Sequence, residues 1–108
     1  MSDKEFDFQR LNFLRHLIQL TRTGALTLTE LVINQSAIVN ELRTVNHDWK
    51  EPYQALLSSI LEIQTDAKNA GYEELSDDDT VRVVLLLGNL NRKIENLELY
   101  IDGRKGFI

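Results

Sequence analysis

The sequence contains no cysteine and only one proline among its 108 residues. Without cysteine, the chain has no disulfide bond, no thiolate metal ligand and no thiol nucleophile. It also has no basic stretch followed by an apolar core, as in a signal peptide, and no apolar run near the roughly 18 residues of a membrane-spanning helix. We therefore expect a cytoplasmic protein that does not enter a membrane.

Groups suited to catalysis are also scarce. The two histidines, His16 and His47, fall in different predicted helices, and we expect both on the surface. His47 and Asp48 are neighbours in sequence, but adjacent helical positions do not face each other and so do not form an oriented dyad. No glycine-rich phosphate loop is present. These absences predict a protein that is not an enzyme and binds no cofactor.

Charge is unevenly distributed along the chain. Seventeen acidic and twelve basic residues give a net charge of -5, which disfavours binding to nucleic acid. The range 8–29 holds three arginines and no acid, whereas the range 62–79 holds seven acids and Lys68 alone. This polarity predicts solvated charged faces, of which either is a candidate docking surface for a partner.

The most apolar stretch of the chain is the range 80–101. Its apolar residues recur at spacings of three and four, as in a helix that packs lengthwise against other helices, at Val83, Leu87, Leu90, Ile94, Leu97 and Ile101. Valine-rich runs also suit strands, but the continued heptad favours a helix. We expect the first half of the helix to lie between neighbours, because it has no polar face beyond Arg82; its apolar residues are Val81, Val83, Val84, Leu85, Leu86 and Leu87. Close packing is the expected reason for Gly88 inside the helix.

Similar apolar spacings predict three further helices, and the four are expected at roughly 4–23, 28–48, 52–70 and 77–102. Gly24 is a natural helix stop, and Thr27 with Glu30 matches a capping box that starts the next helix. Pro52 suits a first helical position, so we expect a junction at Asp48–Pro52.

The second helix has one polar residue in its apolar seam. The seam consists of Leu28, Leu31, Gln35, Ile38, Leu42, Val45 and Trp49. We expect Gln35 to set the register of packing or to be partially exposed. The same phase can be followed backward through Gly24, so one helix over residues 6–49 is an alternative. A glycine inside a helix costs about 1 kcal/mol, which favours a break.

Four helices with short connections and one apolar stripe each predict an all-α protein with the architecture of an antiparallel four-helix bundle. We expect residues 1–108 to form it as a single domain. If residues 6–49 are continuous, the result is a bundle of three helices, whose overhanging seam would favour a homodimer.

Two acidic groups are candidate metal ligands. Asp77, Asp78 and Asp79 lie where the last helix begins, and we interpret them as cap and dipole partners because the other ligands of a calcium loop are missing. Glu95, Glu98 and Asp102 share one helical face and would be the metal ligands of a metal-dependent hydrolase. We expect them to form surface ion pairs, with Arg92 one turn before Glu95, and predict no metal site.

The chain is not identified as a member of any family, although parts of it resemble known types. The tract Leu90–Leu97 resembles the small helical-bundle chaperones of flagellar export, which implies binding of an aggregation-prone subunit. The range Leu42–Leu56, with Trp49 at a bend, is similar in outline to the helical-hairpin proteins of type VII secretion, although Glu51 stands where those have a glycine. As a small acidic bundle, the chain also resembles bacteriocin immunity proteins and phage inhibitors in type.

We therefore expect a non-enzymatic protein-protein interaction module of the inhibitor, immunity or adaptor type. An export chaperone, a metal-dependent hydrolase and a nucleic-acid-binding regulator that uses Arg10, Arg15 and Arg22 are the alternatives. The expected partner is another protein, and a homodimer is possible. The candidate partner surface consists of Arg15, Gln19, Arg22, Glu73, Glu74, Asp77, Asp78 and Phe107.

Overall fold

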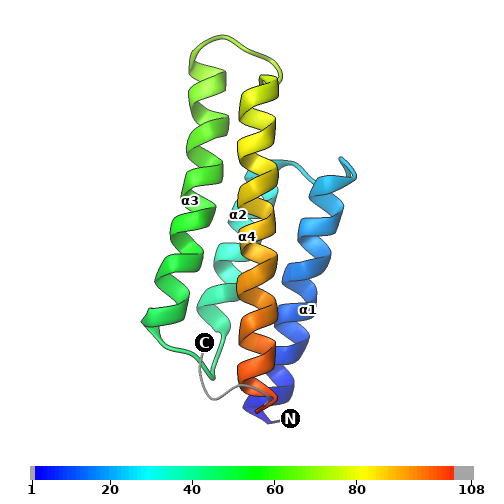
Figure 1. Cartoon of the computed structure of the whole chain (residues 1–108), viewed down its shortest axis with the longest axis vertical. Coiled ribbons are helices and arrows are strands. Elements are labelled where there is room, and N and C mark those ends of the chain that lie inside the picture. Colours follow the sequence, from blue (N-terminus) through cyan, green and yellow to red (C-terminus); the bar gives the residue numbers. More distant parts are fainter. Residues whose placement is uncertain (1, 104–108) are drawn as a thin grey trace.

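The computed structural model describes residues 2–103, which form four helices and no strand. The helices are α1 (Asp3–Arg22), α2 (Leu28–Glu41), α3 (His47–Asn69) and α4 (Asp77–Ile101), and successive helices run in opposite directions (Figure 1). The bundle measures 47 × 23 × 22 Å. This confirms the predicted all-α, antiparallel four-helix bundle.

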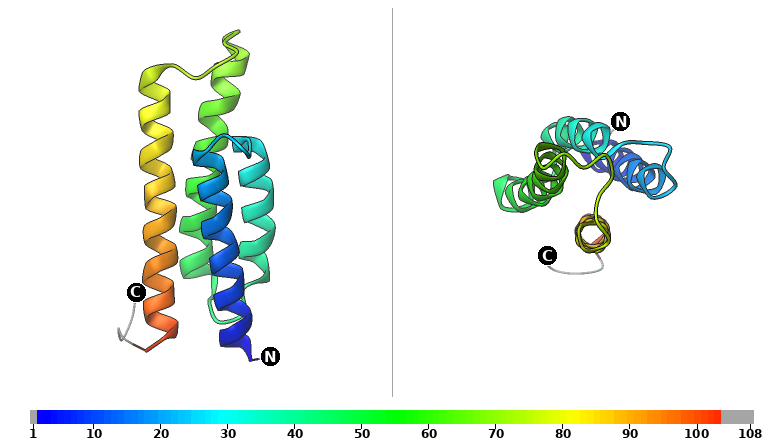
Figure 2. Two further views of the ribbon diagram at one scale, coloured as in Figure 1. Left: turned by 90° about the vertical axis from the view of Figure 1, so that its right-hand side faces the viewer. Right: turned by 90° about the horizontal axis from the view of Figure 1, so that it is seen from above.

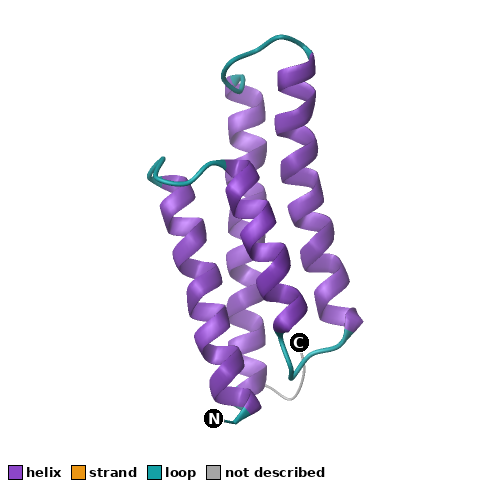
Figure 3. Cartoon of the chain, turned by 180° about the vertical axis from the view of Figure 1, so that it is seen from behind, coloured by secondary structure: helices purple, strands orange, loops and turns teal. Residues whose placement is uncertain are grey.

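The four helices follow one another in chain order and form a closed ring. Each helix contacts the next, and α4 closes the ring against α1. Seen from above, α1, α2 and α3 form an arc, and α4 lies across its open side (Figure 2). Because α3 and α4 are longer than α1 and α2, their connecting turn extends beyond the α1–α2 turn (Figure 3).

The chain breaks between α1 and α2 as predicted. Gly24 has a φ of 82°, in the left-handed region that suits glycine. The hydroxyl of Thr27 accepts a hydrogen bond from the amide of Glu30 at 3.1 Å, and the Glu30 carboxylate accepts one from the Thr27 amide at 3.2 Å. This capping box begins α2, so residues 6–49 do not form one helix.

The next junction lies earlier than the sequence predicted. The structure ends α2 at Glu41 and begins α3 at His47, so the predicted end of the second helix at 48 and start of the third at 52 are wrong. Asn46 is the N-cap, and its side-chain oxygen accepts a hydrogen bond from the amide of Asp48 at 3.0 Å. Pro52 lies in the second turn of α3, where its missing N–H costs one helical hydrogen bond.

A buried carboxylate on α1 explains this early end of α2. Asp7 is fully buried and accepts hydrogen bonds from the amides of Arg43 at 2.9 Å and Thr44 at 2.7 Å, and from the Thr44 hydroxyl. The ammonium of Lys50 donates to the carbonyl of Leu42 at 2.9 Å. These long-range contacts satisfy the backbone groups that a continued helix would have used.

The core joins the four apolar seams and also encloses the side chain of Gln35. All six predicted seam residues of α4 are buried, whereas Phe13 on α1 is 46% exposed. Gln35 is fully buried; its amide donates to the carbonyl of Leu14 at 2.8 Å, and its oxygen accepts from the Tyr53 hydroxyl at 2.8 Å. Gln35 therefore links α1, α2 and α3 and is not partially exposed.

Burial of Tyr53 predicts a pH-dependent stability. Desolvation raises the pKa of the Tyr53 phenol, only partly opposed by its hydrogen bond to Gln35. Above the ordinary tyrosine pKa of about 10, the unfolded chain releases a proton that the folded chain retains, so the free energy of unfolding should fall by up to about 1.4 kcal/mol per pH unit. Urea denaturation across this range should show that Tyr53→Phe removes this component of the slope. The exposed control Tyr72→Phe should keep it; equal slopes would contradict the burial of a neutral phenol.

The Asp7 contacts predict a second stability effect. Asp7→Ala leaves the amides of Arg43 and Thr44 without their acceptor, so it should lower the free energy of unfolding by about 2–4 kcal/mol in urea denaturation. Glu5→Ala changes an exposed acid of the same helix and should cost less than about 1 kcal/mol. Equal losses in the two variants would mean that Asp7 does not hold the α2–α3 connection.

Candidate functional site

The outward side of α4 exposes apolar residues near the start of the helix. Val81, Val84 and Leu85 are 57%, 53% and 63% exposed. They lie opposite the buried seam, because α1 and α3 cover only one side of α4. The prediction that this half of the helix lies between neighbours is therefore wrong for the single chain. The apolar surface remains uncovered.

Gly88 continues this surface one turn further along α4. A Cβ atom added at Gly88 would meet nothing within 4 Å, so packing within the chain does not require glycine there, contrary to the expectation from sequence. A glycine inside a helix costs about 1 kcal/mol relative to alanine. Its absent side chain leaves a flat place that another backbone can approach closely. Val81, Val84, Leu85 and Gly88 together are called the α4 outer face below.

A hollow of about 440 Å³ adjoins the α4 outer face. The longer α3–α4 hairpin extends past the α1–α2 turn at this end of the bundle (Figure 1). Residues of both turns line the hollow, and Val84 belongs both to its lining and to the α4 outer face. Most of its lining is apolar or uncharged. The lining residues are Thr21, Arg22, Leu26, Thr27, Leu28, Gln64, Leu75, Thr80, Val83, Val84 and Leu87.

Four of the predicted partner-surface residues lie beside the α4 outer face. Glu73 and Glu74 are in the α3–α4 turn, and Asp77 and Asp78 begin α4; all four are exposed, and together they are called the acidic tip. Ser76 is the N-cap, since its hydroxyl accepts a hydrogen bond from the third helical amide at 3.1 Å. The acidic tip therefore borders an apolar surface, which its sequence position did not indicate.

The predicted residues on α1 are exposed but play different parts. The guanidinium of Arg15 forms an ion pair with Glu98 of α4, with one contact at 3.3 Å. Gln19 is exposed, and Arg22 lines the hollow. Arg15 thus ties α1 to α4 as well as facing solvent. Phe107 lies outside the described residues.

The carboxylate row on α4 does not gather into a metal site. Glu98 reaches Arg15 on α1, whereas the sequence predicted pairing through Arg92 within the helix, and Glu95 is exposed. No group of three or more histidine, aspartate or glutamate side chains within residues 2–103 is placed to hold a metal ion.

The remaining groups suggested by sequence are dispersed as well. Both histidines, His16 and His47, are exposed, as predicted. Of the three arginines considered for nucleic-acid binding, Arg10 forms an ion pair with Glu41 at 3.6 Å, and Arg15 is paired with Glu98.

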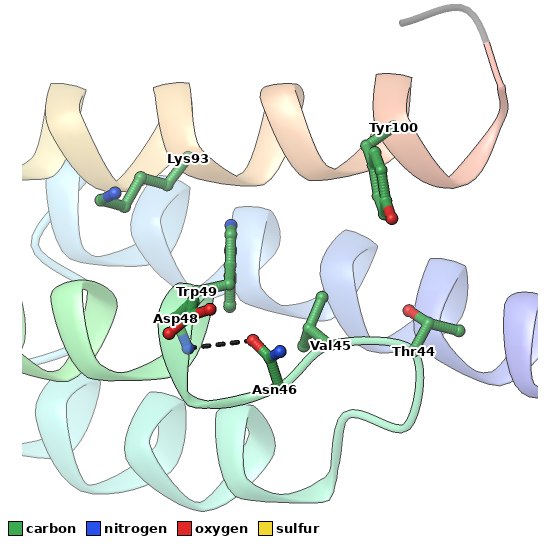
Figure 4. Close-up of a pocket in the computed structure, with 7 residues that line it drawn as sticks. All are labelled: Thr44, Val45, Asn46, Asp48, Trp49, Lys93 and Tyr100. Carbon is green, nitrogen blue, oxygen red and sulfur yellow. Dashed lines mark hydrogen bonds between the residues drawn. The ribbon is translucent and has the colours of Figure 1, made fainter. Parts of the chain in front are cut away.

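A second hollow, of about 390 Å³, lies at the other end of the bundle, between α4 and the α2–α3 connection (Figure 4). Its lining residues are Thr44, Val45, Asn46, Asp48, Trp49, Lys93 and Tyr100. Sequence patterns did not indicate this hollow, because Thr44, Val45 and Asn46 in its lining were predicted to be helical and lie instead in the α2–α3 connection. It is called the Trp49 pocket below.

No helix among residues 2–103 has a stretch apolar and long enough to cross a bilayer. Comparisons with protein-family models, with curated proteins and with solved structures find no match to this chain. Its surfaces must therefore be interpreted from their own chemistry.

The free space at Gly88 makes a prediction for stability. Gly88→Ala should raise the free energy of unfolding by up to about 1 kcal/mol, because alanine favours the helix and its methyl group meets no neighbour. Gly24→Ala is the matched control and should destabilise the fold, since φ at that position is positive. Thermal or urea denaturation measures both. A loss of stability in Gly88→Ala would mean that the glycine serves packing within the chain.

Proposed function

We propose that this chain is a non-enzymatic protein-interaction module of the inhibitor or adaptor type, which binds another protein through the α4 outer face. The observation that carries the proposal is the exposure of Val81, Val84 and Leu85 in line with a glycine that the fold does not need. Contiguous apolar surface on a helix is typical of sites that receive a partner helix or strand.

The charges beside this surface indicate the chemistry of the partner. The acidic tip places four exposed carboxylates next to the α4 outer face, and the whole chain has a net charge of -5. A partner that combines apolar side chains with lysine or arginine would be attracted and oriented by this field. A second copy of this chain would instead bring like charge toward like charge, so we propose a different protein, with a basic amphipathic helix as the contacting element.

Magnitudes indicate how much of the surface the partner must cover. Fully burying an exposed valine or leucine gains about 1.5–3 kcal/mol, so three half-exposed side chains together offer roughly 3–5 kcal/mol. Association itself costs an estimated 4–15 kcal/mol. A stable complex therefore also needs the neighbouring hollow and the charge pairs with the acidic tip.

Photocrosslinking in the source cells tests the proposal. A benzophenone amino acid is placed at Leu85, or at Ile33 as a control, which is equally exposed but lies on α2. We expect one adduct from position 85 that is absent from position 33, with a partner whose contacting segment is basic and amphipathic. Adducts shared by both positions, or an adduct of the chain with itself alone, would refute the proposal.

The affinity of the identified complex gives the quantitative test. Leu85→Ser should weaken binding by about tenfold, since it removes roughly 1–2 kcal/mol of apolar burial from a side chain that is 63% exposed in the free chain, whereas Ile33→Ser should leave it unchanged. Asp77→Asn combined with Asp78→Asn should slow association and reduce its dependence on salt. Calorimetry and stopped-flow mixing measure these effects. Equal affinities for the two serine variants would place the interface elsewhere.

A further inference from the structure

We propose that the Trp49 pocket is a binding site for a carboxylate with a small apolar body. The pocket lies at the end of the bundle opposite the acidic tip and shares no residue with the α4 outer face. Its volume of about 390 Å³ is in the range of small-ligand sites. This site is independent of the proposed protein-binding surface.

The indole of Trp49 supplies a hydrogen-bond donor without an acceptor. Trp49 is 6% exposed, and its Nε1 is buried and has no hydrogen-bond partner. A buried polar group left unpaired costs about 1–3 kcal/mol, and buried indole N–H groups usually find partners. Figure 4 shows the ring edge with Nε1 turned toward α4 across the pocket. Because a water-sized probe does not reach Nε1, a ligand atom that accepts this hydrogen bond must first displace a neighbouring side chain slightly, and the bond would then recover the cost.

The orientation of this donor is fixed by the core behind it. The Trp49 ring stacks on Tyr53 with centroids 5.0 Å apart and an interplanar angle of 25°. Tyr53 is in turn held by its hydroxyl hydrogen bond to buried Gln35. The indole N–H is therefore directed before any ligand arrives, which reduces the entropy lost on binding.

The facing side of the pocket adds positive charge. Lys93 and Tyr100 line it from α4, and no carboxylate among residues 2–103 forms an ion pair with the Lys93 ammonium. Figure 4 shows the Lys93 side chain extending along α4 away from Tyr100, so its flexible stem must turn toward the indole for the ammonium and the N–H to bind one carboxylate together. Asp48 on the rim repels anions, and it repels a phosphate dianion more strongly than a monocarboxylate. Val45 and the aromatic rings provide contact for an apolar body.

The same chemistry could come from a free small carboxylate or from an aspartate or glutamate side chain of a bound protein. Benzoate represents the first source, and N-acetyl-glutamate amide, whose only charge is its side-chain carboxylate, represents the second. Benzamide and inorganic phosphate serve as neutral and dianionic controls. Whichever carboxylate binds more tightly identifies the source.

Trp49 is the sole tryptophan, so the single indole N–H signal of the chain comes from this pocket. In proton–nitrogen correlation spectra, we expect a saturable downfield shift of the single indole N–H signal with one or both carboxylates, and a weaker response to benzamide and phosphate. Lys93→Gln should weaken carboxylate binding by about tenfold or more. Lys68→Gln, an exposed lysine of α3 outside the pocket, should not.

Three outcomes would overturn the proposal. They are an indole signal unmoved by both carboxylates, an equal response to benzamide, and equal weakening in the two lysine variants. Circular dichroism shows whether Lys93→Gln remains folded. If Lys93→Gln does not remain folded, carboxylate binding is measured with Tyr100→Phe, which keeps the ring and removes only the hydroxyl donor.

Discussion

The structure depends on one buried amide. Gln35 can satisfy its donor and its acceptor only when the carbonyl of Leu14 on α1 and the hydroxyl of Tyr53 on α3 lie on either side of α2 at the same height. Apolar seams tolerate sliding, because one leucine contact resembles the next, whereas an unpaired buried amide is costly. The hydrogen bonds of Gln35 therefore set the axial register of three helices. Trp49 lies one turn before Tyr53, so this register also fixes the position of the Trp49 pocket relative to α4.

Asp7 provides the second constraint, and it explains which parts of the fold could be predicted. Helix number, direction and the break at Gly24 follow from local patterns, namely apolar spacing, a positive-φ glycine and a capping box, and these predictions are confirmed. The end of α2 depends instead on the carboxylate of Asp7, which accepts a hydrogen bond from the amide of Arg43, 36 residues later in the chain. Local rules interpret an acidic residue near the start of a helix as a partner of the positive end of the helix dipole. They therefore give no indication of a contact with a distant part of the chain. Local patterns failed to predict the start of α3 for the same reason, and therefore they did not predict the Trp49 pocket.

The α4 outer face was half predicted. Sequence alone indicated that the first half of α4 is too apolar for one buried side, and this holds for Val81, Val84 and Leu85. The error lay in assuming that the chain supplies its own cover. Among the four described helices, α4 contacts α1 and α3, and these two cover one apolar seam of α4. The apolar residues beyond that seam stay exposed in the single chain, and the proposed partner would cover them.

α4 connects the two proposed sites mechanically. Lys93 lines the Trp49 pocket, and Val81 lies twelve positions earlier on the same helix, about 18 Å away at 1.5 Å per residue. The helix is uninterrupted between them, so a displacement along its axis at one site reaches the other. Packing against α1 and α3 and the Arg15–Glu98 ion pair oppose such movement. An exposed ion pair contributes only about 0–1 kcal/mol, so the packing supplies most of this resistance. Coupling between the sites therefore requires a ligand that favours one axial position of α4 over another, and a ligand that fits the pocket as it stands leaves the α4 outer face unchanged.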